Sequence, residues 1–208
     1  MFDTYLRGLK DRLIEPLAAP LASVSPAFIT LLGLLTGLTA GFLAAIGSVL
    51  PSLLVWLLSR LLDGLDGLVA RRFNKQSDFG GYLDIVCDFA VYAAVPIGLT
   101  LANPTTTNFI ALAVMLASFY INAASWMYLS ALLEKRAAHD ESTQTSIIMP
   151  SGLVGATESI TAFCIFLLFP TYIAPLFGIF TALVFVTIIQ RLIWAKQNLT
   201  PDTKTHDT

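Results

Sequence analysis

The sequence predicts an all-α fold, a polytopic bundle of membrane helices, and two observations carry that prediction. Of the 208 residues, 56% are hydrophobic and only 12% are charged, whereas soluble domains carry about 25% charged residues. The apolar residues also gather in stretches of about 20 residues, the length that a helix needs to cross a bilayer. We therefore expect one membrane domain with six transmembrane helices.

Turn residues separate the predicted spans. Gly47-Ser48, Asn103-Pro104 and Pro170 mark tight turns. The six candidate spans cover residues 27–47, 51–71, 79–102, 107–132, 152–169 and 171–194.

Amphipathic and polar segments flank the spans. Residues 1–24 place a leucine at every third or fourth position and charged residues off that face. This pattern suits a juxtamembrane helix on the membrane surface and equally a helix packed on the bundle. We divide the chain into this helix (1–24), the six-span domain (25–196) and a polar tail (197–208) expected to be disordered.

The basic residues indicate how the bundle is oriented. The turns after spans one, three and five contain no Lys or Arg, and the positive-inside rule places the opposite face in the cytoplasm. The loop and terminal cations all lie on that face: Arg7, Lys10, Arg12, Arg71, Arg72, Lys75, Lys135, Arg136, Lys196 and Lys204.

Several function classes find no support. No basic face with interleaved aromatics is present, so no nucleic-acid partner is expected. His139 and His206 lie in polar stretches, while Cys87 and Cys164 lie in apolar ones, where cysteine usually serves as a small core residue. A histidine- or zinc-based mechanism is therefore not indicated.

Four aspartates lie inside or beside apolar segments, where a charge is costly and usually functional. Asp63 and Asp66 share one helical stripe, and Asp84 and Asp88 share another. The basic linker between them is short enough to form a helical hairpin, so the two stripes can face each other. The residues that continue the stripes at helical spacing are Gly67, Ala70 and Arg71 in the first and Gly80 in the second.

Clustered carboxylates repel one another, and a divalent cation, or two, removes that repulsion. All-oxygen ligands favour Mg²⁺ or Mn²⁺. The alternative is a set of helix caps and ion pairs to Arg71, Arg72 and Lys75.

The stretch from Asp63 to Asp88 resembles the CDP-alcohol phosphotransferases, whose pattern is D-x2-D-G-x2-A-R-x8-G-x3-D-x3-D. Chain length and hydropathy layout also resemble those of the family from about Pro26 to the last apolar segment, and the chain looks closest to an uncharacterised bacterial inner-membrane branch. Every fixed position matches: Asp63, Asp66, Gly67, Ala70, Arg71, Gly80, Asp84 and Asp88.

The resemblance implies an enzyme that moves a phosphatidyl group from CDP-diacylglycerol to the hydroxyl of a small polar alcohol and releases CMP. It implies that Asp63, Asp66 and Asp84 hold Mg²⁺ or Mn²⁺, with two ions expected. It also implies that Asp88 is the catalytic base and lies close enough to touch one ion. The spacing of the acids does not by itself separate these roles.

The resemblance further implies that Gly67, Ala70 and Gly80 line the cytidine and phosphate pocket. The Arg71 fork of donors suits a phosphate. Arg191 is a candidate acceptor contact, although a positive-inside anchor explains it as well.

Other residues leave alternatives open. Arg60 either snorkels or pairs with an acid, and Gly81 is interpreted as a packing residue. Glu158 is a polar contact within the bundle or an acceptor contact, and residues 134–150 form a polar loop. Ala27 stands where relatives often carry Asn, which puts a polar contact there in doubt.

The expected partners are CDP-diacylglycerol, a small alcohol and membrane lipid, with a homodimer left open. The acceptor is also open among glycerol 3-phosphate, inositol or its phosphate, and serine. The expected location is a bacterial inner membrane, with the active site facing the cytoplasm. Rival hypotheses are a CDP-choline or CDP-ethanolamine transferase, a divalent-cation transporter, a membrane prenyltransferase and a non-catalytic lipid-binding protein.

Overall fold

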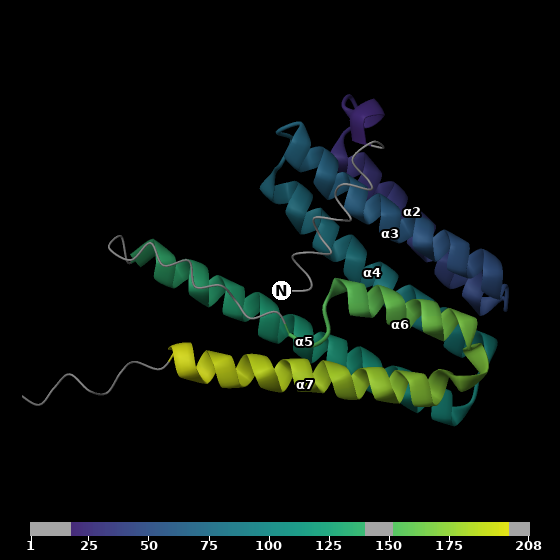
Figure 1. The fold of residues 1–208 in the computed structure, drawn as a ribbon. Coiled ribbons are helices and arrows are strands. Elements are labelled where there is room, and N and C mark those ends of the chain that lie inside the picture. Colours follow the sequence, from purple (N-terminus) through teal and green to yellow (C-terminus); the bar gives the residue numbers. More distant parts are fainter. Residues whose placement is uncertain (1–17, 140–151, 200–208) are drawn as a thin grey trace, which may run out of the picture.

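The computed structural model describes residues 18–139 and 152–199, and every regular element in those ranges is helical. The predicted all-α membrane bundle is confirmed (Figure 1). The predicted N-terminal helix lies outside the described residues up to residue 17, and so does the tail from residue 200. The elements in chain order are η1 (Ala19–Leu21), α2 (Pro26–Ala45), α3 (Val49–Arg72), α4 (Asp78–Ala102), α5 (Thr106–His139), α6 (Ala156–Leu168), η2 (Pro170–Tyr172) and α7 (Ile173–Leu199).

The six predicted spans coincide with the six α-helices of the described ranges, but the helices are not equivalent. In those ranges, α2, α4, α5 as far as Arg136 and the segment Pro170–Leu199 are long and apolar enough to cross a membrane. Helix α6 has 13 residues and is therefore about 20 Å long, shorter than a hydrocarbon core of about 30 Å. Helix α3 has 24 residues but carries five charges, on Arg60, Asp63, Asp66, Arg71 and Arg72.

The predicted turns separate the helices, whereas one helix end differs from the prediction. Gly47 adopts a φ of 75° between α2 and α3, a conformation that glycine takes without steric cost. Helix α5 continues to His139, so the expected polar loop does not begin at residue 134. The residues from 134 onward are polar, which suggested a loop, but Glu, Lys, Arg and Ala are strong helix formers and continue the helix beyond its apolar part.

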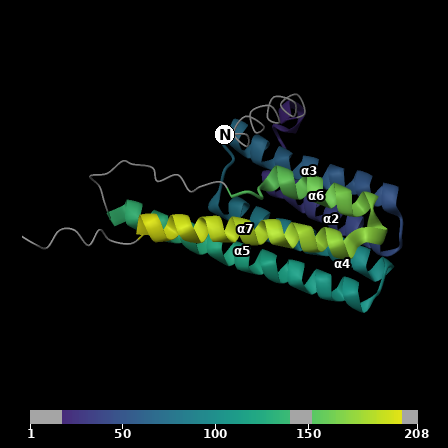
Figure 2. The ribbon, with the colours of Figure 1, turned by 60° about the horizontal axis from the view of Figure 1, so that its bottom comes forward.

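Helix α2 packs along both α3 and α4, and these are the most extensive contacts in the described ranges. The backbones of α3 and α4 approach each other at far fewer points, and side-chain contacts such as that between the Trp56 and Tyr92 rings join these two helices alongside α2. Glycine permits the close approach of α2 to α4, because a Cβ at Gly41 would lie 2.8 Å from the carbonyl oxygen of Ala94. Figures 1 and 2 show α5 and α7 side by side opposite this group, with α6 between.

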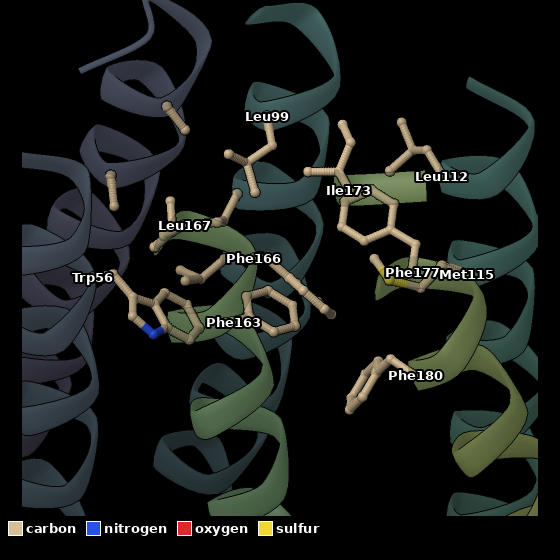
Figure 3. Packing of buried hydrophobic residues seen from close by; sticks show 14 of the residues in the cluster. Trp56, Leu99, Leu112, Met115, Phe163, Phe166, Leu167, Ile173, Phe177 and Phe180 are labelled. Atoms are coloured by element: carbon tan, nitrogen blue, oxygen red, sulfur yellow. The ribbon is translucent and has the colours of Figure 1, made fainter. Parts of the chain in front are cut away.

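An aromatic core joins the two groups of helices through α6 (Figure 3). The Phe163 ring stacks on Trp56 of α3, with centroids 4.9 Å apart, and meets Tyr92 of α4 edge to face at 5.1 Å. One turn along α6, Phe166 meets Phe177 of α7 edge to face at 5.0 Å. Such ring pairs stabilise beyond the apolar area that they bury, so the short helix α6 is central to the packing.

Phe163→Ala should therefore lower the thermal stability of the purified protein strongly, because truncating a buried Phe costs about 3–5 kcal/mol. Phe185→Ala on α7 is the matched control, since that ring is 38% exposed. Thermal unfolding of both variants in the same detergent measures the difference. Equal melting temperatures for the two variants would show that α6 does not connect the bundle as described.

Candidate active site

The linker between α3 and α4 sets the register of the two acidic helices. Asn74 takes a left-handed conformation with a φ of 53°, which asparagine tolerates better than most residues. Lys75 Nζ donates to the carbonyl oxygens of Ala22 and Val24 at 2.7 and 3.0 Å. The Ser77 hydroxyl then caps α4 by accepting the Gly80 N–H at 3.1 Å, a frequent helix start. The linker is thus tied to the segment that leads into α2.

All four aspartates of the motif line one narrow cavity of about 10 Å³. Helices α3 and α4 supply the acids, and α2 closes the cavity from a third side. Asp66 is 4% exposed, whereas the Asp63 and Asp88 side chains are 25% and 34% exposed. The lining residues are Thr30, Gly33, Leu34, Arg60, Asp63, Asp66, Asp84, Cys87, Asp88 and Val91.

Arg60 lies among these acids, which settles the alternatives that its sequence position left open. Its Nη1 donates to Asp88 Oδ1 at 2.7 Å and lies 3.7 Å from Asp63 Oδ1. The residue is 5% exposed, so it pairs with acids inside the bundle instead of snorkelling to the surface. The sequence signal for this contact was its position one turn before Asp63, on the same stripe of α3.

Thr30 is a site residue that the sequence-based predictions missed. Its Oγ1 donates to Asp66 Oδ2 at 2.6 Å, and this hydrogen bond is buried. Relatives often carry a threonine in the first span, but a threonine in an apolar helix commonly bonds to a carbonyl of the preceding turn, as Thr30 also does with Pro26 at 3.1 Å, so its carboxylate partner on α3 was not predicted.

A wider cavity of about 250 Å³ adjoins the narrow one and shares Thr30, Asp66 and Asp84 with it. The four residues predicted for the cytidine and phosphate pocket all line this wider cavity. They are Gly67, Ala70, Arg71 and Gly80. The other lining residues are Ser25, Pro26, Ala27, Lys75, Gln76, Ser77, Phe79 and Gly81.

Two glycines in the wider cavity have distinct roles. A Cβ at Gly67 would lie 3.1 Å from Arg71 Nη1, so glycine at this position leaves room for the guanidinium. A Cβ at Gly81 would meet no atom within 4 Å. The interpretation of Gly81 as a packing residue was therefore wrong, because it borders open space.

Arg191 and Glu158 are engaged elsewhere. Arg191 Nη1 donates to Asn122 Oδ1 at 2.9 Å and joins α7 to α5, and the residue lines neither of the two cavities. The structure does not bring it together with the other predicted substrate-binding residues. Glu158 Oε2 accepts the Gly155 N–H at 3.0 Å and caps α6, which is a structural contact.

The donor set suits a hard divalent cation, because four carboxylates and one hydroxyl face the narrow cavity. One guanidinium against four carboxylates leaves three negative charges to be neutralised if all are ionised. The described side chains nevertheless do not form a ready group of three metal ligands. Asp88 faces Arg60 and Asp66 faces Thr30, so metal uptake would require the carboxylates to turn toward a common point.

Comparison with known proteins supports the resemblance drawn from the motif. The family described as CDP-alcohol phosphatidyltransferase matches residues 23–195. Inner membrane protein YnjF of Escherichia coli (strain K12) is 36% identical over 196 residues, which cover 89% of this chain and 94% of that protein. Archaetidylinositol phosphate synthase of Methanothermobacter thermautotrophicus is 30% identical over 195 residues, 93% of each chain.

Solved structures share the fold. Mycobacterium tuberculosis phosphatidylinositol phosphate synthase with CDP-DAG bound superposes with a TM-score of 0.66 at 20% identity, covering 95% of this chain and 99% of that one. The same enzyme in complex with manganese and citrate gives a TM-score of 0.65, also at 20% identity, over 93% and 92% of the two chains. The family assignment made from the sequence is confirmed, and with it the assignment as an enzyme: the chain belongs to the CDP-alcohol phosphatidyltransferase family.

Proposed function

We propose that the protein transfers the phosphatidyl group of CDP-diacylglycerol to the hydroxyl of a small polar alcohol and releases CMP. The observation that carries this proposal is the junction of the two cavities at Thr30, Asp66 and Asp84. The wider cavity is large enough for much of a nucleotide, and its far side ends on the acid cluster. A pyrophosphate bound across the junction would therefore meet the carboxylates.

The residues of the wider cavity suit the nucleotide. Arg71 and Lys75 are cations on its wall, and Gly67, Gly80 and Gly81 let a flat ring or a phosphate come close to the backbone. The mycobacterial phosphatidylinositol phosphate synthase, which shares this fold, has been solved with CDP-DAG bound. By analogy the cytidine end would occupy the wider cavity, and the diacylglycerol chains would extend toward lipid.

We assign Asp63, Asp66 and Asp84 to binding Mg²⁺ or Mn²⁺, with two ions expected. The mycobacterial synthase has also been solved in complex with manganese and citrate. When bound, such ions neutralise the carboxylates and the pyrophosphate and polarise the phosphorus under attack. The Thr30 hydroxyl would orient the Asp66 carboxylate through its hydrogen bond without itself binding the ion. Hydrogen-bond partners of metal ligands commonly have this role.

Asp88 acts as the general base in this proposal. The acceptor hydroxyl forms a bond to the phosphorus that carries diacylglycerol, and its proton passes to Asp88. The bond between that phosphorus and the bridging oxygen breaks, and CMP leaves with the electron pair. The face that carries the loop cations is assigned to the cytoplasm, so the cavities would open toward the inside of a bacterial inner membrane.

The acceptor is best sought among several small alcohols. Two relatives are named as synthases of inositol phosphate lipids, which makes inositol phosphate the first to test. However, two arginines that could contact a phosphorylated acceptor bind other groups: Arg136 donates to the carbonyls of Asn198 and Leu199, and Arg191 donates to Asn122. Neutral inositol, serine and glycerol 3-phosphate therefore belong in the same panel.

Purified protein given CDP-diacylglycerol, Mn²⁺ and this panel should release CMP with one alcohol, read by chromatography of CMP and mass spectrometry of the lipid. Asp88→Asn should lower the rate at least about 100-fold, because general-base catalysis typically contributes 10²–10⁴-fold. Asp78→Asn is the matched control, since Asp78 lies on α4 but lines neither cavity. A normal rate for Asp88→Asn would remove Asp88 from the base role.

Chelation by EDTA should abolish turnover, and Mg²⁺ or Mn²⁺ should restore it.

Thr30→Val should weaken Mn²⁺ binding by about 10–100-fold, the usual effect of losing a hydrogen bond to a metal ligand. Thr36→Val is the control, because the Thr36 hydroxyl bonds to carbonyls of its own helix α2. Activity that persists in EDTA would rule out metal-dependent chemistry, and cation flux without CMP release would indicate a transporter.

A further inference from the structure

We infer that Lys75 is a positioning residue that couples the segment before α2 to a nucleotide bound in the wider cavity. This segment, residues 18–25, is called the entry segment below. The inference rests on the proposed function, since it takes a nucleotide as the occupant of that cavity. Lys75 falls among the eight unspecified positions between Arg71 and Gly80 of the family pattern, so the motif assigns it no role.

Two hydrogen bonds of Lys75 join parts of the chain that are distant in sequence. Its Nζ donates to the carbonyl oxygens of Ala22 and Val24 at 2.7 and 3.0 Å, across 53 and 51 residues. Both carbonyls belong to the turn between η1 and α2. Backbone carbonyls outside a helix need donors from elsewhere, and the ammonium supplies them here.

The other side of the entry segment rests on α3. Ala18 is fully buried and forms an apolar cluster with Leu65 and Val69 of α3, and Leu21 and Val24 pack against that cluster. Apolar contacts are not directional, whereas the two hydrogen bonds of the lysine are. The apolar contacts therefore hold the segment against α3, and the lysine fixes the edge that faces the linker.

That edge continues directly into a wall of the wider cavity. Ser25 and Pro26 line this cavity, and Lys75 lines it from the linker between α3 and α4. The carbonyls bound by the ammonium lie one and three residues before Ser25. A displacement of the ammonium would therefore displace this wall of the cavity.

The ammonium retains the means to bind an anion. Both of its carbonyl partners are neutral, so they leave its positive charge in place. A lysine ammonium has three N–H donors, and the two carbonyls leave a third for an oxygen of a bound phosphate. A diphosphate in the cavity would thus hold the ammonium by a charge-assisted hydrogen bond and, through it, the entry segment. Because such coupling is reciprocal, loss of the contact should also weaken nucleotide binding.

Hydrogen exchange tests the coupling without any turnover, with cytidine diphosphate and Mn²⁺ as the probe. The N–H groups of Ala22 and Val24 donate to the carbonyls of Ala19 and Leu21, so a peptide spanning residues 18–25 reports opening of the entry segment. Saturating cytidine diphosphate should slow its exchange. Lys75→Met should speed exchange about tenfold in the absence of nucleotide, and saturating nucleotide should no longer slow it. A purely structural lysine would leave the nucleotide response intact.

Calorimetric titration with cytidine diphosphate measures the other side of the coupling. Lys75→Met should weaken binding at least about tenfold, the usual effect of losing a hydrogen bond to a charged group. Lys75→Arg should stay within about threefold of the unchanged protein, because it keeps the charge and the donors. Lys135→Met is the matched control, since Lys135 is exposed and lines neither cavity.

An unchanged nucleotide affinity in Lys75→Met, or a nucleotide response of the entry segment that persists in it, would overturn the inference. An entry segment that ignores the nucleotide in the unchanged protein would overturn it as well. A protein that binds cytidine diphosphate but releases no CMP from CDP-diacylglycerol would count against the transferase alone, because the exchange and affinity data still decide the role of Lys75.

Discussion

Enclosed negative charge is the constraint on which the rest of this structure depends. Four carboxylates border a cavity that has room for about one water molecule, and helices surround it on three sides. Low dielectric surroundings make the repulsion among such charges severe. Among the residues that the structure describes, the Arg60 guanidinium and the Thr30 hydroxyl form hydrogen bonds to these acids, and a bound divalent cation would balance the charge that remains.

The aromatic core and the acid cluster form one continuous structure. The rings of α6 join α3 and α4 to α7, and the same Trp56 and Tyr92 that contact Phe163 also flank Arg60. Packing in the apolar half of the bundle therefore determines where the guanidinium lies in the polar half. A short helix that contributes no residue to either cavity thus influences the geometry of the site.

Much of the fold and of the site could be predicted from local pattern. The length of the apolar stretches predicted the helices. Helical spacing correctly placed Asp63 and Asp66 on α3 and Asp84 and Asp88 on α4. What could not be predicted depends on partners distant in sequence. Thr30 reaches Asp66 across 36 residues, and the pairing of Arg60 with Asp88 spans 28. The packing of α2 along both α3 and α4 and the contact of α7 with α5 through Arg191 are tertiary contacts of the same kind.

We propose that the acid cluster binds divalent cations where the two cavities meet, and the anomalous X-ray scattering of manganese would locate such ions. Crystals grown with Mn²⁺ and CDP-diacylglycerol should show anomalous density beside Asp66 and Asp84, with the cytidine next to Gly67 and Gly80. Density for manganese elsewhere in the bundle, with the nucleotide bound and the aspartates free of metal, would contradict a metal site at this cluster.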